Sequence, residues 1–315
     1  MKTLRLYGAG LLVALLLALT ACGTSGGGTG REMYLFLTAV TYGNGLFVAV
    51  GTGGTILTSP DGVSWTQRTS PTSNSLYGAT YGNGTFVAVG GYSRLWSSAS
   101  VILTSPDGVN WTQQASGTGY PLNGVTYGNG LFVAVGENGT ILTSSDGVTW
   151  TARTSGTGNF LNGVTYGNGL FVAVGYNGAI FTSPDGVNWT QQTSGTHNFL
   201  RGVAYGNGTF VAVGSGGAIL TSSDGVTWTA RTSGTGNGLI GVTYGNGLFV
   251  AVGPGGTILT SSDGVNWTAR TSGTYNPLSS VTYGNGLFVA VGPGGTILTS
   301  PDGVNWTRQT PPTGN

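Results

Sequence analysis

The chain has 315 residues, of which 61 are glycine, 39% are hydrophobic and only 6% are charged, whereas about a quarter of the residues of an average soluble domain are charged. Its formal net charge of +1 excludes the basic surface that binds nucleic acid. It contains one His, one Cys and one Lys, too few for a zinc site built from several His or Cys or, with only Lys2, for a phosphate-binding loop. We therefore expect no metal, no cofactor and no nucleic-acid partner.

Residues 1–21 are predicted to be a signal peptide. Lys2 and Arg5 precede an apolar run over 6–19, which is shorter than the roughly 20 residues that span a membrane. The run ends in Leu-Thr-Ala-Cys, which resembles the lipobox of bacterial lipoproteins; the resemblance implies that Cys22 is lipidated and becomes the mature N-terminus. Residues 23–30 contain only Gly, Thr and Ser, so we expect 22–34 to be a flexible tether. This organisation predicts an extracytoplasmic protein held by lipid on the cell membrane or the outer membrane.

The rest of the chain, residues 35–315, is dominated by a repeated unit. Tyr-Gly-Asn-Gly occurs seven times, and Asp-Gly-Val-x-Trp-Thr also occurs seven times. Successive tryptophans of the second motif are 46, 39, 39, 39, 39 and 39 residues apart; they are Trp65, Trp111, Trp150, Trp189, Trp228, Trp267 and Trp306. A period of this length is typical of propellers, solenoids and other repeat architectures.

One unit predicts four strands, over 122–127, 131–136, 140–144 and 148–154. The dipeptides Asn129-Gly130 and Asp146-Gly147 favour tight hairpin turns between them. A lone meander of four strands cannot bury both of its faces, but seven such sheets packed radially can. The sequence therefore predicts an all-β fold, a seven-bladed β-propeller with four antiparallel strands in each repeat of about 39 residues. An open β-solenoid is the alternative.

The Ser-x-Asp-Gly-x-x-Trp motif resembles the Asp-box of sialidase-like (BNR) propellers, although it is one residue shorter. The wider unit, Val-Gly-x-x-Gly-x-Ile-x-x-(Ser/Thr)-x-Asp-Gly before the Trp, resembles the repeats of Ycf48-type photosystem II assembly factors. The resemblance covers about residues 35–310. It implies that the box forms the turn between the third and fourth strands, on the face opposite the ligand site.

The acidic residues favour a structural role over catalysis. An Asp in a tight turn accepts backbone N–H groups, and every Asp of the chain lies in a box: Asp61, Asp107, Asp146, Asp185, Asp224, Asp263 and Asp302. Only Glu32 and Glu137 remain, whereas glycoside hydrolysis normally uses two carboxylates in one site. His197, in a loop between blades, is expected on the face opposite every Asp, so a Ser-His-Asp triad cannot form. We therefore expect no enzymatic activity.

The arginines also fail to form a cluster that would hold an acidic substrate. They recur three residues after the box Trp, on the predicted outermost strand, at Arg68, Arg153, Arg231 and Arg270. Gln114 and Gln192 replace them in other repeats. This pattern predicts a solvated outer rim.

Function is best sought where the repeats differ, which is in two sets of loops expected on one face of the propeller. These are the loops between the second and third strands and those between blades. They contain the candidate binding residues Tyr92, Arg94, Trp96, Tyr120, Glu137, Phe160, Tyr176, His197 and Phe199. Exposed aromatics beside charged residues suit a glycan or a protein partner. Alternatively, the insertion at 91–100 plugs the channel or covers a blade.

The sequence thus predicts a monomeric, non-catalytic, lipid-anchored propeller that binds an unidentified protein or glycan at the bacterial cell envelope. The alternatives are an assembly factor or chaperone like the Ycf48-type proteins, a passive spacer or coat component, and a sialidase-type hydrolase, which the missing acids disfavour. Because both chain ends lie at a blade boundary, we expect the ring to close by packing of the first blade against the last, without a shared sheet.

Overall fold

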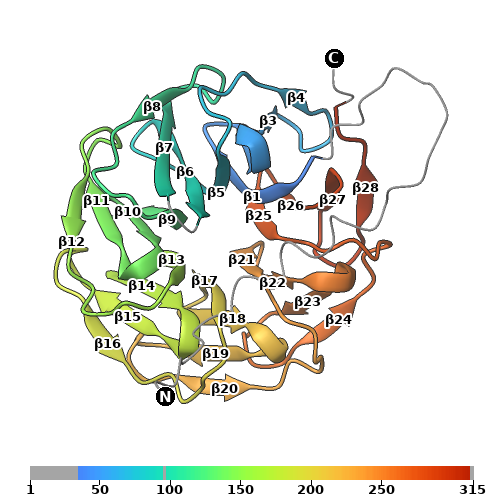
Figure 1. Cartoon of the computed structure of the whole chain (residues 1–315). Coiled ribbons are helices and arrows are strands. Elements are labelled where there is room, and N and C mark those ends of the chain that lie inside the picture. The colour runs from blue at the N-terminus through green and yellow to red at the C-terminus, as the bar shows by residue number, and fades with distance from the viewer. Residues whose placement is uncertain (1–34, 95–96, 313–315) are drawn as a thin grey trace, which may run out of the picture. The chain divides into compact units, whose positions relative to one another are not determined.

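A computed structural model describes residues 35–94 and 97–312, which belong to a compact unit spanning 34–315. These residues form seven sheets of four antiparallel strands, each built from four consecutive strands and arranged around an axis as blades (Figure 1). The predicted seven-bladed β-propeller is confirmed. The predicted signal peptide, Cys22, the tether, Glu32 and Trp96 lie outside the described residues.

The strands of each blade run from the central channel outwards. The first strands are β1 (Leu37–Gly43), β5 (Ser75–Gly82), β9 (Leu122–Gly128), β13 (Leu161–Gly167), β17 (Leu200–Gly206), β21 (Gly241–Gly245) and β25 (Ser280–Gly284). The second strands are β2 (Leu46–Gly51), β6 (Thr85–Arg94), β10 (Leu131–Gly136), β14 (Leu170–Gly175), β18 (Thr209–Gly214), β22 (Leu248–Val252) and β26 (Leu287–Gly292).

The third strands are β3 (Ile56–Ser59), β7 (Ser97–Ser105), β11 (Ile141–Ser144), β15 (Ile180–Ser183), β19 (Ile219–Ser222), β23 (Ile258–Ser261) and β27 (Thr296–Ser300). The outer strands are β4 (Thr66–Gln67), β8 (Thr112–Gln114), β12 (Thr151–Arg153), β16 (Thr190–Gln192), β20 (Thr229–Arg231), β24 (Thr268–Arg270) and β28 (Thr307–Gln309). Short 3₁₀ turns join the second and third strands of five blades: η1 (Thr52–Gly54), η2 (Glu137–Gly139), η3 (Tyr176–Gly178), η4 (Ser215–Gly217) and η5 (Pro254–Gly256).

The outer strand is shorter than the sequence predicted. In the third blade, residues 148–154 were expected to be extended, but β12 comprises only Thr151–Arg153. The Asp-Gly turn occupies the residues before it, because Val148 and Thr149 donate their backbone N–H groups to the Asp146 carboxylate instead of to a strand. The first strand is in turn one residue longer than predicted and ends at Gly128.

The hydrophobic core lies between blades, not within them. Each second strand has the sequence (Leu/Thr)-Phe-Val-Ala-Val, and its Phe-Val-Ala-Val part is buried on both faces. β-Branched and aromatic side chains such as Val and Phe are enriched in strands. Val87 and Val89 of the second blade thus pack in one cluster with Phe132 and Ala134 of the third. An isolated blade would expose these side chains to water, so the ring stabilises every blade through both of its neighbours.

The residues before the first strand also bind the last blade. The backbone N–H of Gly295 donates to the Leu35 carbonyl at 2.7 Å, and Phe36 forms an isolated bridge with Pro293. Strand β1 contacts β5 of the second blade on one side and β25 of the seventh blade on the other, and the second of these contacts closes the ring. Closure therefore rests on packing without a shared sheet, as expected, together with this short backbone latch.

Candidate functional site

The two faces of the ring differ in what they carry. We define the loop face as the one formed by the turns between second and third strands and by the connections between blades. Backbone bonds join these two sets: Tyr176 donates to the Phe160 carbonyl and Gly178 donates to the Asn198 carbonyl, both at 2.9 Å. We define the turn face as the opposite one, which carries the Asn-Gly and Asp-Gly hairpin turns.

Each Asp of the turn face is engaged by its own turn. In the first blade, the Asp61 Oδ1 atom accepts the backbone N–H groups of Val63 and Ser64 and the hydroxyl of Ser59, all at 2.8 Å. The Trp65 indole N–H donates to the Gly62 carbonyl at 2.9 Å. These donors stabilise the ionised carboxylate. The backbone N–H of Ser64 contributes most, and together they lower the pKa of Asp61 from 3.8 to about 2.

The other six carboxylates have the same surroundings. The pKa of Asp224 falls to about 2, mainly through the Thr227 N–H, and the remaining ones are also held below the ordinary value by backbone donors: Asp107, Asp146, Asp185, Asp263 and Asp302. Within the described residues, no group of three or more His, Cys, Asp or Glu side chains is placed to hold a metal ion.

The prediction of a solvated outer rim of arginines is wrong in one respect. Arg153 is half-buried, and its Nε donates at 2.8 Å to the hydroxyl of Thr143, which is buried on β11. Gln114 makes the equivalent 2.8 Å bond to Thr104 through its Nε2. The Arg and Gln side chains each donate an N–H group to the Thr hydroxyl of the neighbouring third strand, which explains why either residue occurs at this position of the repeat.

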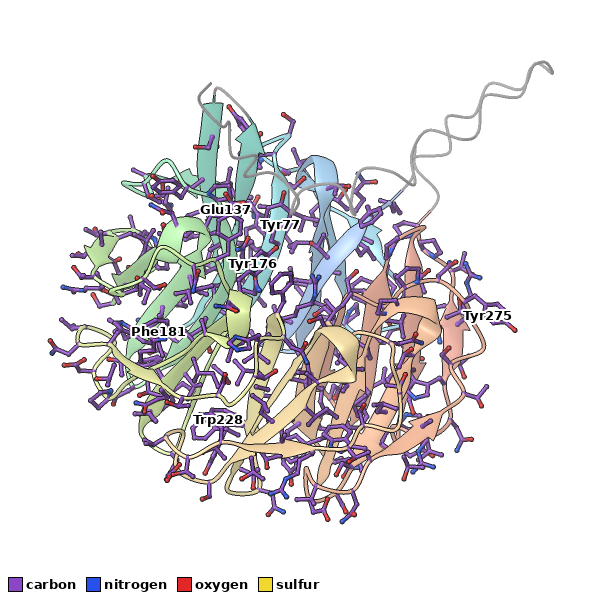
Figure 2. The ribbon with its side chains drawn as sticks, turned by 60° about the horizontal axis from the view of Figure 1, so that its bottom comes forward. Tyr77, Glu137, Tyr176, Phe181, Trp228 and Tyr275 are labelled. Carbon is purple, nitrogen blue, oxygen red and sulfur yellow. The ribbon has the colours of Figure 1, made fainter. Side chains whose placement is uncertain are left out.

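The insertion in the second blade lengthens a hairpin. Strands β6 and β7 stay paired beyond the ordinary repeat, with Tyr92 opposite Ala99 and Arg94 opposite Ser97. Figure 2 shows this hairpin projecting from the ring. At its base, the Ser100 hydroxyl bonds the hydroxyl of Ser116 and the carbonyl of Thr118. Leu95 and Trp96, the residues expected to plug the channel or cover a blade in the alternative interpretation, lie outside the described residues.

Three of the predicted binding residues form a cluster on the loop face of the fourth blade, between its junctions with the third and fifth blades. The rings of Tyr176 and Phe199 are stacked, with centroids 4.5 Å apart and an interplanar angle of 11°. Phe160 also packs against Tyr176, with ring centroids 5.1 Å apart and an interplanar angle of 39°. Phe199 is 42% exposed, and nearby the His197 Nδ1 atom lies 3.2 Å from the Asn177 Oδ1. We call Phe160, Tyr176 and Phe199 the aromatic cluster.

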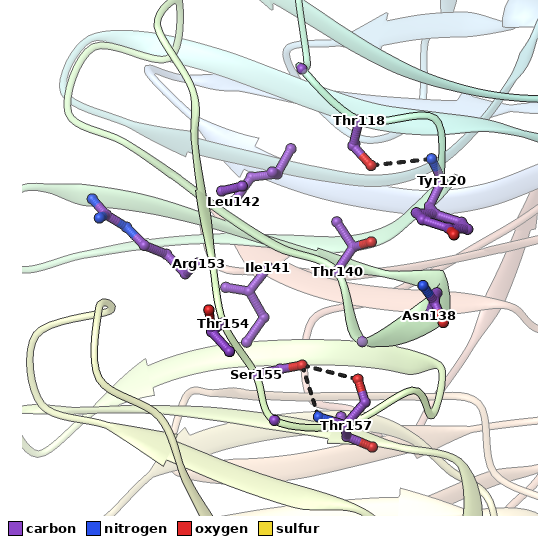
Figure 3. Close-up of a pocket in the computed structure, with 14 residues that line it drawn as sticks. Thr118, Tyr120, Asn138, Thr140, Ile141, Leu142, Arg153, Thr154, Ser155 and Thr157 are labelled. Atoms are coloured by element: carbon purple, nitrogen blue, oxygen red, sulfur yellow. Dashed lines mark hydrogen bonds between the residues drawn. The ribbon is translucent and has the colours of Figure 1, made fainter.

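Tyr120 and Glu137 lie elsewhere on the loop face. Tyr120, at the junction of the second and third blades, lines a groove of about 440 Å³ together with Asn138, Thr140 and Arg153 (Figure 3). A similar groove of about 550 Å³ lies between the fifth and sixth blades, so the groove is a product of the repeat. Glu137 is half-buried at the start of η2.

The structure adds functional candidates that sequence reasoning missed. The residue after the buried Leu at the start of each unit varies more than any other position of the first strand. It is Thr38, Tyr77, Asn123, Asn162, Arg201, Ile240 and Ser279 in the seven blades. Where this residue is Asn, its side chain connects neighbouring blades: the Asn162 Nδ2 atom donates to the Leu200 carbonyl at 2.8 Å. Arg201, at the same position of the fifth blade, is exposed. Comparing the repeats position by position would have found it.

Comparison with known proteins shows the fold. No family model and no curated protein matches the chain. Among solved structures, it is similar to "YCF48 bound to D1 peptide" (TM-score 0.66, 16% identity, covering 86% of this chain and 92% of that one). It is also similar to YCF48 from Cyanidioschyzon merolae (0.64, 16%, 84% and 95%) and to the computationally designed Ika8 protein (0.61, 10%, 86% and 97%).

These likenesses agree with the repeat pattern that resembles Ycf48-type proteins. At 10–16% identity they establish the propeller architecture and nothing finer. The part of the chain that the structure describes also contains no helix of the length and hydropathy needed to cross a bilayer.

Proposed function

We propose that this chain is a non-catalytic propeller, anchored by a lipid on Cys22 at the cell envelope, that binds a protein partner through the aromatic cluster of its loop face. The observation that carries the proposal is the stacking of Tyr176 on Phe199 across two blades, in loops where the repeats diverge. Rigid, partly exposed aromatic rings are the side chains that most often dominate binding energy in protein interfaces.

A protein partner suits the cluster better than a glycan. One face of the Tyr176 ring is covered by Phe199, with ring centroids 4.5 Å apart, and so is closed to a sugar. Two of the three members are phenylalanines, which supply apolar area but no hydrogen bond for a hydroxyl. The similar YCF48 structure holds a D1 peptide, which supports a peptide-binding role for this architecture, including a role in assembling other proteins.

A hydrolase is the weaker candidate. Of the described acidic residues, Glu137 alone lies on the loop face, since the seven Asp residues lie in the turns of the opposite face. Two carboxylates within one site are the normal requirement for glycoside hydrolysis. Replacing Glu137 by Gln therefore serves as the test: a hydrolase would lose turnover of envelope glycans, whereas a binding face would keep its partner.

The proposal is tested by affinity capture from detergent-solubilised envelopes, with the full chain as bait. The variant Phe160→Ser/Tyr176→Ser removes the half-buried members of the cluster. Val187→Ser/Val226→Ser, which changes two exposed residues of the turn face, is the matched control. We expect a protein that is retained by the parent chain and the control and is lost, by about tenfold or more, with the cluster variant. Equal retention by both variants would contradict the proposal.

A further inference from the structure

The groove beside Tyr120 differs from the equivalent places of other repeats in the residues on its walls. Its volume of about 440 Å³ lies within the range of about 300–1,000 Å³ that is usual for ligand sites. In Figure 3, Tyr120, Asn138 and Thr140 lie at one end of the groove and Arg153 at the other. The groove itself is a product of the repeat, but two substitutions at this end are not.

The first substitution is Tyr120, which replaces an asparagine. The equivalent residue of the other connections is Asn74, Asn159, Asn198, Asn237 and Asn276. The Asn237 Nδ2 atom donates to the Thr257 hydroxyl at 3.0 Å, and the Asn276 Nδ2 atom donates to the Thr296 hydroxyl at 2.8 Å. The equivalent hydroxyl in this groove is that of Thr140. Since tyrosine has no amide to donate, Tyr120 leaves this hydroxyl to another partner.

The second substitution is Gly158, which leaves the side chain of Asn138 uncovered. In the fourth blade the equivalent residues are His197 and Asn177, and the His197 Nδ1 atom lies 3.2 Å from the Asn177 Oδ1. A Cβ added to Gly158 would lie 3.7 Å from the Asn138 Oδ1, so a side chain there would stand beside this amide. Because the residue is glycine, the exposed Asn138 keeps an acceptor and two N–H donors for a ligand.

The β6–β7 hairpin holds the connection that carries Tyr120. The Ser100 hydroxyl bonds the Ser116 hydroxyl and donates to the Thr118 carbonyl at 2.7 Å. The Tyr120 N–H in turn donates to the Thr118 hydroxyl at 3.2 Å. The insertion that lengthens this hairpin occurs in the second repeat alone. A ring that is held in place before a ligand arrives loses less conformational entropy on binding.

The lining of the groove suits an uncharged sugar. Ile141 and Leu142 are each only 1% exposed, so the ring of Tyr120, which is 44% exposed, is the largest exposed apolar group. None of the described residues of the lining is acidic, and its one charged residue, Arg153, already bonds Thr143 as part of the repeat. A sugar offers C–H groups to the face of a ring and hydroxyls to polar side chains, whereas a protein partner would find little apolar area to bury.

We propose that this groove binds a neutral oligosaccharide, with one sugar ring stacked on Tyr120 and its hydroxyl or acetamido groups bonded to Asn138 and Thr140. The site goes beyond the proposed function, because it lies at a different blade junction from the aromatic cluster and takes a different class of ligand. It depends neither on the lipid anchor nor on the protein partner.

The test is isothermal titration calorimetry of the full chain with chitotetraose, cellotetraose and maltotetraose. We expect at least one of them to bind with a dissociation constant of about 1 mM or lower. Tyr120→Asn should weaken this binding by about tenfold or more, because it removes the stacking ring and gives Thr140 the donor found in other repeats. Gly158→His should weaken it as well, because the imidazole should cover Asn138 as His197 covers Asn177.

Tyr275→Gly is the matched control. Tyr275 is 94% exposed and lines the similar groove between the fifth and sixth blades, and the equivalent residue is glycine in three other connections, at Gly119, Gly158 and Gly236. This variant should leave the affinity unchanged. All three substitutions install residues that equivalent positions already hold, so thermal midpoints close to that of the parent should accompany them.

Three results overturn the inference. The first is that none of the three sugars binds at millimolar concentrations. The second is that Tyr120→Asn and Gly158→His leave the affinity unchanged, and the third is that Tyr275→Gly weakens binding as much as Tyr120→Asn does. Capture of the protein partner is measured separately and should be the same for Tyr120→Asn as for the parent chain.

Discussion

The ring of Tyr42 in the first blade lies directly against Gly284 in the last, so closely that a Cβ added to Gly284 would lie 2.1 Å from the Tyr42 Cγ. The same contact joins every neighbouring pair of blades, for example Gly43 with Tyr81. Each Tyr also packs on the Phe of its own blade, as Tyr42 does on Phe47 with ring centroids 4.6 Å apart. One Gly and one Tyr per blade therefore set the spacing of the first strands around the channel.

This contact predicts that Gly284→Ala destabilises the closure of the ring. The added methyl group cannot fit beside the Tyr42 ring, and overpacking of this kind costs about 1–3 kcal/mol. The thermal midpoint should fall by several degrees. Gly236→Ala is the control, because a Cβ there meets no atom within 4 Å. Equal midpoints for the two variants would show that the Tyr42 contact does not hold the ring closed.

Most of the fold could be predicted from the sequence because one pattern is repeated seven times. The spacing of Trp65 and its equivalents gave the number of blades, and the Gly-containing turns gave the order of the strands. The start of the outer strand could not be predicted, because Val148 and Thr149 have the composition of a strand but donate their backbone N–H groups to Asp146. Local composition does not reveal whether a backbone N–H group donates to a neighbouring strand or to a side chain of its own turn.

The candidate site was predictable only in part. Divergence among the loops singled out Phe160, Tyr176 and Phe199 as candidates, and the structure places the Tyr176 ring in contact with the other two. Phe36 and Arg201 were missed. Phe36 precedes the first complete unit, and Arg201 sits within a strand that otherwise looks identical from repeat to repeat. Phe36 is bridged to Pro293 of the last blade, a contact that no single repeat contains.

The Asp-Gly turns predict how stability depends on pH. The pKa of Asp61 and that of Asp224 lie at about 2 in the folded ring, below the ordinary 3.8, because backbone N–H groups stabilise the ionised form. A lowered pKa contributes stability that is complete above about pH 4 and is lost as the pH falls towards 2. The thermal midpoint should thus be level from pH 5 to 8 and should fall steadily below pH 4.

The same measurement on Asp224→Asn provides the comparison. This variant removes one of the seven titrating carboxylates, so its midpoint should be lower than that of the parent at pH 7 and closer to it at pH 2.5. A parent midpoint that is the same at pH 2.5 and pH 7 would mean that the turns do not depend on the ionised carboxylates.

The outer strand predicts that Arg153 can be replaced by Gln but not by Leu. Gln114 and Gln192 already donate 2.8 Å bonds to Thr104 and Thr182 in their own blades, so Arg153→Gln should change the free energy of unfolding by less than about 0.5 kcal/mol. Arg153→Leu leaves the buried Thr143 hydroxyl without this donor and should cost about 1 kcal/mol. Urea unfolding of the two variants measures the difference. Equal costs would mean that the arginine acts only through its charge.

Phe199 and Phe210 lie eleven residues apart, but their replacement by Ala is predicted to destabilise the ring to very different extents. Phe210 is fully buried between the fourth and fifth blades, where it packs with Val172 and Val174. Its replacement by Ala should cost about 3–5 kcal/mol, as in other cores. Phe199 is 42% exposed and stacks on Tyr176 of the neighbouring blade, so Phe199→Ala should cost less than about 1 kcal/mol. If thermal unfolding showed equal losses, Phe199 would be a structural anchor of its loop and not part of a face kept for a partner.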